Sequence, residues 1–418
     1  MHRPSAPPRR DASRGRRIRP VAIWRRRALS LVGALALSAA CGEPPGPGNR
    51  PPAGADELLV PEREWGSADG DSGGIDFGSI SSIAVSPSSD VYVADERAAS
   101  IFVFDASGRY LRRIGRDGEG PGEFRWLRSL GFAGDTLRAF DVRLWRMTSL
   151  TADGRVARID PVPPEEDFGQ PADFAFARHG ALHHLGFGRY QASLEAAMTG
   201  RRHGRVRGEV TVERWSPGDS AWTVTVEAPG LEVFVDMDEG SLSDPWFARR
   251  LLWASAPAGG AWTGDTETGT LVRWAANGTR LAEARVPLTP EPFSDADPAA
   301  FANAEDVADE ARRTLVRNRR RAVELPPTKP VVRSMLPTAE GGILVAERLN
   351  GVDPPVRGGN AGQDAARRWF AYDAAGRLVA TLALAARTEP FVVAGDAIWA
   401  VGRDSLDVQR IEKWTVRR

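Results

Sequence analysis

Residues 80–114 read ISSIAVSPSSDVYVADERAASIFVFDASGRYLRRI, and this stretch decides the fold. Apolar and polar residues alternate in four short runs, which begin near Ile83, Val91, Ile101 and Tyr110. Turns that contain Ser, Asp and Gly separate these runs, and alternation with a period of two between such turns is typical of short β-strands. The stretch therefore predicts four short strands joined by tight turns.

The same unit recurs along the rest of the chain. Its second strand begins in six places, at residues 91, 137, 182, 261, 343 and 397. The sixth copy lacks a fourth strand, and the segment Leu58–Trp65 can supply it, which removes the free edge. The sequence thus predicts an all-β fold for residues 57–418: a six-bladed β-propeller of four-stranded blades, closed by N- and C-terminal strands.

The first copy also resembles a known repeat. Residues 90–124, DVYVADERAASIFVFDASGRYLRRIGRDGEGPGEF, are similar to an NHL repeat, including the Gly118–Phe124 link to the next blade. The chain as a whole resembles the bacterial six-bladed β-propeller lipoproteins. The resemblance implies a propeller in the bacterial cell envelope.

Two insertions break the spacing of the repeats. Residues 189–207 lengthen the third blade, and residues 292–323 lie before the fifth. The second insertion is rich in Ala, Glu and Arg, with Pro298 early and arginines late, which predicts a helix. We expect either a lid that packs on the propeller or part of a binding site.

The N-terminus has the pattern of a targeting segment. Three arginines at 25–27 precede a 13-residue apolar run at 28–40, too short to span a bilayer. Cys41 is the sole cysteine, and Leu37-Ser38-Ala39-Ala40-Cys41 resembles a bacterial lipobox, which implies a signal peptide over 1–40 and a lipid on Cys41. An ordinary cleaved signal with an incidental cysteine is the alternative.

The residues after Cys41 indicate where in the cell envelope the protein is expected to lie. Gly42, by resemblance to sorted lipoproteins, favours the outer membrane over retention at the inner one. Residues 41–56 are rich in Pro and Gly and predict a tether between the lipid and the propeller. The expected location is the cell envelope, with the propeller facing the periplasm or the exterior and the membrane contacted through the lipid only.

Charge and cysteine content exclude several classes of protein. Residues 41–418 hold 45 basic and 54 acidic residues, a net charge of −9, which argues against nucleic acid as a partner. A single cysteine excludes an intramolecular disulfide, a cysteine zinc site and an iron–sulfur cluster. The Gly118–Gly122 stretch lacks GxGxxG or Walker spacing and is interpreted as a turn.

The search for catalytic or metal-binding groups yields few candidates. His183 and His184 are adjacent in a strand, so they point to opposite faces and cannot share one metal. Acids end four second strands, and we expect them to accept hydrogen bonds from loop amides: Asp95, Asp141, Asp265 and Glu347. The alternative is calcium in a central channel, as in six-bladed lactonases, but no asparagine falls in a predicted inner strand. No GxSxG elbow is present, so covalent catalysis has no evident nucleophile.

One recurrent feature remains as a candidate site. An arginine lies just beyond the second strand in five blades: Arg97, Arg143, Arg189, Arg348 and Arg403. Loops between second and third strands emerge on one face of a propeller, so these side chains can form an anion- or partner-binding face. Solvated or ion-paired arginines are the alternative, because the chain is arginine-rich throughout.

The sequence favours a non-enzymatic, lipid-anchored binding or scaffold module for a protein, peptide or glycan. It predicts no cofactor, no catalytic residue and no metal site. The alternatives are a metal-assisted hydrolase or lyase on the same scaffold and a sensor or assembly component of envelope machinery, because propellers host many activities.

Overall fold

The computed structural model describes residues 57–59, 61–66, 75–164, 175–176, 181–238, 241–243, 247–256, 259–297, 323–349 and 365–415. The chain divides into two units, Met1–Pro44 and Pro45–Arg418, and all described residues belong to the second. The signal segment, Cys41, the tether and the predicted helix of the second insertion lie outside the described residues. No helix among the described residues has the length and hydropathy to cross a membrane.

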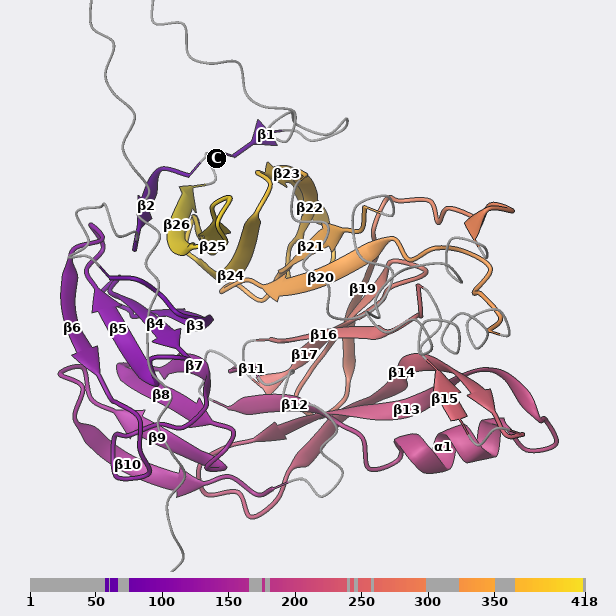
Figure 1. Ribbon diagram of the computed structural model, residues 1–418, viewed down its shortest axis with the longest axis horizontal. Coiled ribbons are helices and arrows are strands. Elements are labelled where there is room, and N and C mark those ends of the chain that lie inside the picture. Colours follow the sequence, from indigo (N-terminus) through magenta and orange to yellow (C-terminus); the bar gives the residue numbers. More distant parts are fainter. Residues whose placement is uncertain are drawn as a thin grey trace, which may run out of the picture. The chain divides into compact units, whose positions relative to one another are not determined.

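The second unit folds into six sheets, which we call blades one to six (Figure 1). Blades one and two contain β3 (Ile80–Val85), β4 (Val91–Asp95), β5 (Ser100–Phe104), β6 (Tyr110–Ile114), then β7 (Leu127–Ala133), β8 (Thr136–Asp141), β9 (Arg146–Leu150) and β10 (Val156–Pro161). Blade three contains β11 (Ala175–Phe176), β12 (Leu182–Gly186), β13 (His203–Trp215), β14 (Thr223–Asp236) and β15 (Ser241–Ser243).

The remaining blades follow in chain order, joined by two strands from the N-terminal side. Blade four contains β16 (Leu251–Ser255), β17 (Ala261–Asp265), β18 (Thr270–Trp274) and β19 (Arg280–Arg285). Blade five contains β20 (Val332–Pro337), β21 (Ile343–Glu347), β22 (Arg367–Tyr372), β23 (Leu378–Leu384) and β1 (Glu57–Leu58). Blade six contains β24 (Thr388–Ala394), β25 (Ala397–Arg403), β26 (Gln409–Thr415) and β2 (Arg63–Trp65). The predicted all-β, six-bladed propeller is confirmed; four of its blades have the predicted four strands, and blades three and five each have a fifth.

Contacts between inner strands join the blades in a ring. Each inner strand contacts the next, and β24 of blade six contacts β3 of blade one; these strands are β3, β7, β11, β16, β20 and β24. A hydrophobic cluster lies between every pair of neighbouring blades. Between blades four and five, the fully buried Trp262 donates its indole N–H to the carbonyl of Gly341 at 3.0 Å. The core is therefore a set of layers between blades, each made by the facing sides of two sheets.

The second strands begin where the repeat predicts them. The strands β4, β12, β17, β21 and β25 start at the predicted residues, and β8 starts one residue earlier, at Thr136. Their apolar residues face both neighbouring blades, so these strands are buried almost throughout. We call the face of the ring at which second strands end, and inner strands begin, the upper face.

The predicted closing strand Leu58–Trp65 is divided between two blades. Only β2 pairs with β26 of blade six, through Arg63↔Lys413, Glu64↔Glu412 and Trp65↔Ile411. The preceding β1 instead pairs in parallel with β23 of blade five, Glu57↔Leu382 and Leu58↔Ala383. Pro61 lies between the two short strands, and proline cannot donate a ladder hydrogen bond.

The insertion in the third blade forms a projection that we call the arm: α1 (Tyr190–Ala197) with residues 203–210 of β13 and 228–236 of β14. The inner neighbour β12 pairs only with residues 211–215, so these parts of the hairpin extend beyond it. Ala, Leu, Gln and Glu favour the helix, and Leu194 and Met198 lie four residues apart on its buried side. They pack against Val206, Val233 and Val235, which gives the arm its own small core.

Candidate functional site

A buried carboxylate organises the upper face of blade one. Asp95 ends β4 with no exposed surface. It accepts hydrogen bonds from the N–H groups of Gly78 at 2.6 Å and Ser79 at 3.2 Å, before β3, and of Ala98 at 2.9 Å, after β4. The side chain therefore ties the connection entering the blade to the loop between its second and third strands.

Blade two repeats this arrangement with one more donor. Asp141 ends β8, is fully buried, and accepts N–H groups of Arg125 at 2.6 Å, Trp126 at 3.1 Å, and Arg143 and Leu144 at 3.0 Å each. The predicted structural role of these acids is confirmed for blades one and two.

In blade four an arginine side chain joins the loop amides at the acid, and in blade five an arginine side chain binds the acid. Asp265 accepts the N–H groups of Glu267 and Thr268 and pairs with Arg207 of the arm at 2.7 Å. Burial raises the pKa of Asp265, but these hydrogen bonds outweigh it and lower that pKa. Glu347 binds Arg368 through two hydrogen bonds of 2.5 and 2.7 Å, which raise the arginine's pKa. Among the residues that the structure describes, no three His, Cys, Asp or Glu side chains are grouped as metal ligands.

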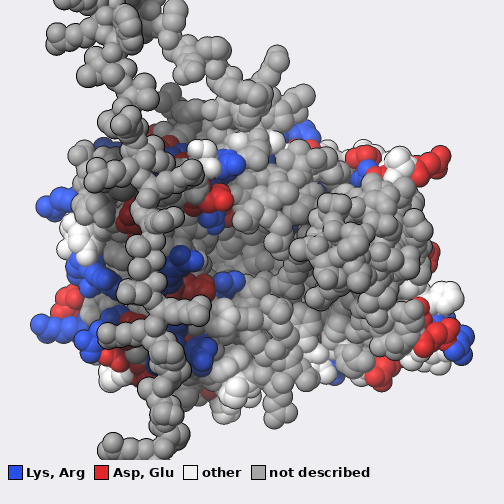
Figure 2. Space-filling model, in the orientation of Figure 1, with Lys and Arg blue, Asp and Glu red and all other residues white. Residues whose placement is uncertain are grey.

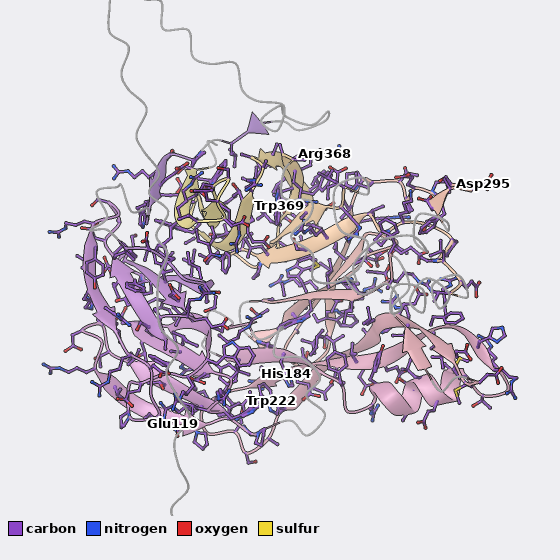
Figure 3. All side chains as sticks on the ribbon, viewed as in Figure 1. Glu119, His184, Trp222, Asp295, Arg368 and Trp369 are labelled. Atoms are coloured by element: carbon purple, nitrogen blue, oxygen red, sulfur yellow. The ribbon has the colours of Figure 1, made fainter. Side chains whose placement is uncertain are left out.

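The histidines of β12 face opposite blades, as their adjacency predicts. His183 Nε2 lies 3.3 Å from the carbonyl of Gly259 in blade four, and burial lowers its pKa to about 4. His184 lies with its ring centroid 4.0 Å from that of Trp222 and its Nε2 3.5 Å from Glu213 (Figure 3).

The five predicted arginines have different surroundings. Arg97 and Arg143 are exposed, and Arg189 is exposed and pairs with Glu227 at 3.0 Å. The guanidinium of Arg348 lies 5.1 Å from the ring centre of Phe247, and Arg403 is the last residue of β25. Basic and acidic side chains are interspersed over the coloured surface in Figure 2. An anion-binding ring made by these five residues remains a prediction.

The base of the arm encloses a cavity on the upper side of the ring, which we call the arm cavity. Its volume is about 330 Å³, and it is bounded by blade three, by β16 of blade four and by β20 of blade five. Three aromatic residues and two arginines stand out in its lining: Phe187, Tyr190, Trp253, Arg250 and Arg333. Cavities of this size with an apolar wall and a few polar groups are typical of ligand sites.

Local packing holds the arm side of this cavity in place. The Tyr190 hydroxyl donates to the carbonyl of Leu231 at 2.8 Å, and its ring meets Phe187 edge-on, with centroids 5.6 Å apart. Gly208 lies beneath this ring, where a Cβ atom would stand 2.3 Å from Tyr190. A glycine is therefore required where β13 passes the first turn of α1.

An ion network fastens the arm to blade four. Glu232 of β14 is fully buried and pairs with Arg249 at 2.5 Å and Arg205 at 3.2 Å. Arg249 also binds Glu267 at 3.0 Å. Burial lowers the pKa of Arg249, but the hydrogen bonds to the two carboxylates outweigh it and raise that pKa. The network therefore fixes the arm against blade four, next to the cavity.

The sequence patterns did not identify the two arginines of the cavity. Arg250 directly precedes β16, and Arg333 lies at a register shift in β20 between Val332, opposite Glu347, and Ser334, opposite Ala346. A β-bulge redirects a side chain. The same shift occurs at Ser81 and Arg128 in blades one and two. In each of these three blades, the bulged residue directly follows the residue that pairs with the acid at the end of the second strand. This position is the sequence signal that could have identified Arg333.

The opposite, lower face has two larger hollows, of about 640 and 660 Å³. They are lined by turns between first and second strands and share Gly395 and Asp396. Their linings contain many Gly, Ala and Ser residues together with a few aromatic and charged ones, such as Trp399 and Lys413 in one and Tyr372 and Arg377 in the other. The arm cavity differs in that an insertion forms part of its wall, and long insertions on a rigid scaffold often carry binding residues, so we take it as the candidate site.

A match to a protein-family model supports the fold. A family model described as DUF5128, 6-bladed beta-propeller, matches residues 74–132. Among curated proteins, none matches the sequence significantly. A solved protein described as exported, from Bacteroides fragilis, is 12% identical with a TM-score of 0.43, covering 86% of this chain and 96% of its own.

Two further solved structures are similar in the same distant way. A member of the duf4221 family from Bacteroides vulgatus is 8% identical with a TM-score of 0.43, covering 86% of this chain and 98% of its own. Virginiamycin B lyase from Staphylococcus aureus is 10% identical with a TM-score of 0.39, covering 85% and 99%. At such identities and scores these structures carry no information about the ligand or activity of this chain.

Proposed function

We propose that this chain is a non-enzymatic binding propeller of the bacterial cell envelope, which binds a protein, peptide or glycan on its upper face. In this proposal a lipid on Cys41 holds it at the outer membrane, and residues 41–56 are the tether. The observation that carries the binding role is the arm cavity. Its wall combines an insertion within blade three with the inner strands of two other blades.

Rigid construction supports a role in recognition. The arm has its own core, and the Glu232 network fastens it to blade four, so the cavity exists before any ligand arrives. A preformed site avoids the cost of ordering loops on binding. Long insertions on a rigid scaffold are also where binding residues concentrate.

The test compares two variants of the full chain on arrays of peptides and glycans. Ser334→Trp places a large side chain in the arm cavity, whereas Ser88→Trp places the same side chain on an exposed turn of the lower face. We expect one class of ligand to be retained by the wild type and by Ser88→Trp and lost by Ser334→Trp. Equal retention by all three proteins, at equal melting temperatures, would contradict the proposed site.

A further inference from the structure

We infer that the lower face carries a second binding site, for an extended peptide in which an apolar side chain is flanked by Lys or Arg. The site is the hollow of about 660 Å³ between blades five and six, which we call the interblade hollow. The inference goes beyond the proposed function, because this hollow lies on the face opposite the arm cavity and shares no lining residue with it.

Three turns surround the interblade hollow. Residues 338–342 and 373–377 form two turns of blade five, and residues 395–396 form the turn between β24 and β25 of blade six. The first turn is closed by a hydrogen bond of 3.0 Å from the N–H of Thr338. In the second, Asp373 accepts two N–H groups of its own turn, at 2.9 and 3.0 Å. These bonds fix the rim on the side of blade five, so little ordering is needed on binding.

The floor of the hollow is the end of the hydrophobic layer between blades five and six. Leu344, Leu382 and Ile398 contribute to both, and each is at most 4% exposed. Val379 stands in the wall with 63% of its surface exposed, and of the large apolar side chains that the structure describes only Leu406 is more exposed. Exposed apolar surface of this kind marks interaction sites. An apolar side chain of a partner would extend the layer and cover Val379.

The charges around the floor are mainly negative. The lining contains three acids and one arginine, a net charge of −2. Asp373 and Arg377 pair with each other at 2.7 Å. Glu340 and Asp396 are exposed, and within the described part of the chain neither side chain forms a hydrogen bond or an ion pair. They lie on turns of neighbouring blades, so both blades present an unneutralised carboxylate, which favours a cationic partner.

The arrangement of these groups favours a peptide. The apolar floor lies between turns that carry the two separate carboxylates, so a complementary ligand has an apolar group between two positive charges. A small amine with one charge can neutralise only one of the acids. In an extended peptide alternate side chains point to the same side, so Phe or Leu can enter the hollow while a basic residue on each side meets Glu340 and Asp396.

The experiment measures binding of labelled peptides to the purified full chain by fluorescence anisotropy. The probe is Ser-Arg-Gly-Phe-Gly-Arg-Ser with blocked ends, and its partner carries citrulline, which has a similar shape without the charge, in place of both arginines. We expect the arginine peptide to bind at least about fivefold more tightly at low salt. Glu340→Gln and Asp396→Asn together should reduce this ratio to about twofold or less. A peptide with Ser in place of Phe should bind at least about fivefold more weakly than the probe.

Two matched variants control for the charge. Asp135→Asn removes an exposed acid from the corresponding two-residue turn of blade two, where Gly134 has a φ of 58° against 64° at Gly395. It lies outside the interblade hollow and should keep the full ratio. Ser334→Trp in the arm cavity should leave binding of the peptide unchanged, which separates this site from the proposed function. If the wild type binds both peptides equally, or if the double variant keeps the full ratio, the inference is wrong.

An apolar pair of variants tests the floor and wall. Val379→Ser should weaken the arginine and citrulline peptides by the same factor, because it removes apolar contact and no charge. Leu281→Ser changes a side chain that is 52% exposed on β19 of blade four and should alter neither affinity. Equal affinities in Val379→Ser and the wild type would contradict the proposed position of the peptide.

Other occupants of the hollow give different results. If 4-phenylbutylamine binds as tightly as the arginine peptide and the double variant weakens both, the hollow is a site for small amines. If the full chain forms a dimer in sedimentation experiments and the double variant does not, the occupant is a second copy. Either result overturns the assignment to a peptide, as does the absence of peptide binding.

Discussion

Asp141→Asn tests whether the buried acids hold the upper face together. The carboxylate accepts four backbone N–H groups, two on each oxygen. Asparagine keeps one acceptor oxygen and turns an NH₂ group toward the other two donors. Hydrogen bonds to a charged group contribute about 1.5–3 kcal/mol each, so loss of two predicts a destabilisation of about 3–6 kcal/mol.

Urea unfolding followed by tryptophan fluorescence and circular dichroism measures this change. The control Asp117→Asn removes a carboxylate that is 69% exposed and pairs with Arg125 at 3.2 Å, so it should cost about 1 kcal/mol or less. Asp95→Asn, with three donors in place of four, should fall between them. If Asp141→Asn unfolds at the same urea concentration as Asp117→Asn, the reasoning about this repeated carboxylate is refuted.

Three further predictions follow from burial, titration and the N-terminal motif. Glu232→Gln leaves Arg205 and Arg249 without the carboxylate that they share, which should lower the free energy of unfolding by about 3–5 kcal/mol and speed hydrogen exchange in β14. Unchanged exchange would contradict the inference that this ion network fastens the arm to blade four. His183, with a pKa of about 4 when folded and about 6.5 when unfolded, contributes stability that is complete above pH 6.5 and is lost as pH falls toward 4. Unfolding at pH 7 and pH 5 should therefore differ by about 1–2 kcal/mol more in the wild type than in His183→Gln, and an equal difference would exclude the titration. Cys41→Ser should abolish incorporation of a labelled fatty acid, and labelling that survives the substitution would disprove the lipid anchor.

The sequence was sufficient to locate the second strands because their signals are local. Each combines a short apolar run, a preceding turn and, in four blades, an acid at its end, as in Val91–Asp95. The positions of the acids also allowed their hydrogen bonds to be predicted, since a carboxylate that ends a strand lies near the amides of the adjoining loop. Asp95 and Asp141 confirm this interpretation.

The arm cavity could not be predicted because it depends on pairing between distant residues. Arg250 and Arg333 lie 83 positions apart in the sequence, and Thr266, in the turn after β17, fixes the backbone near both. The bulge at Arg333 is a property of register, which the residue types alone do not reveal. The helix α1 was missed for another reason: at eight residues it is stabilised by packing on β13 more than by its own propensity.

The parallel pairing of β1 with β23 has a mechanical consequence. Any pull on the chain before Glu57 reaches the two-residue β1 first, and the hydrogen bonds at Leu382 and Ala383 bear that load. The seam between β2 and β26 comes later along the chain, beyond Pro61. Under tension the short pairing of β1 with β23 should therefore break first, while the pairing of β2 with β26 keeps the ring closed.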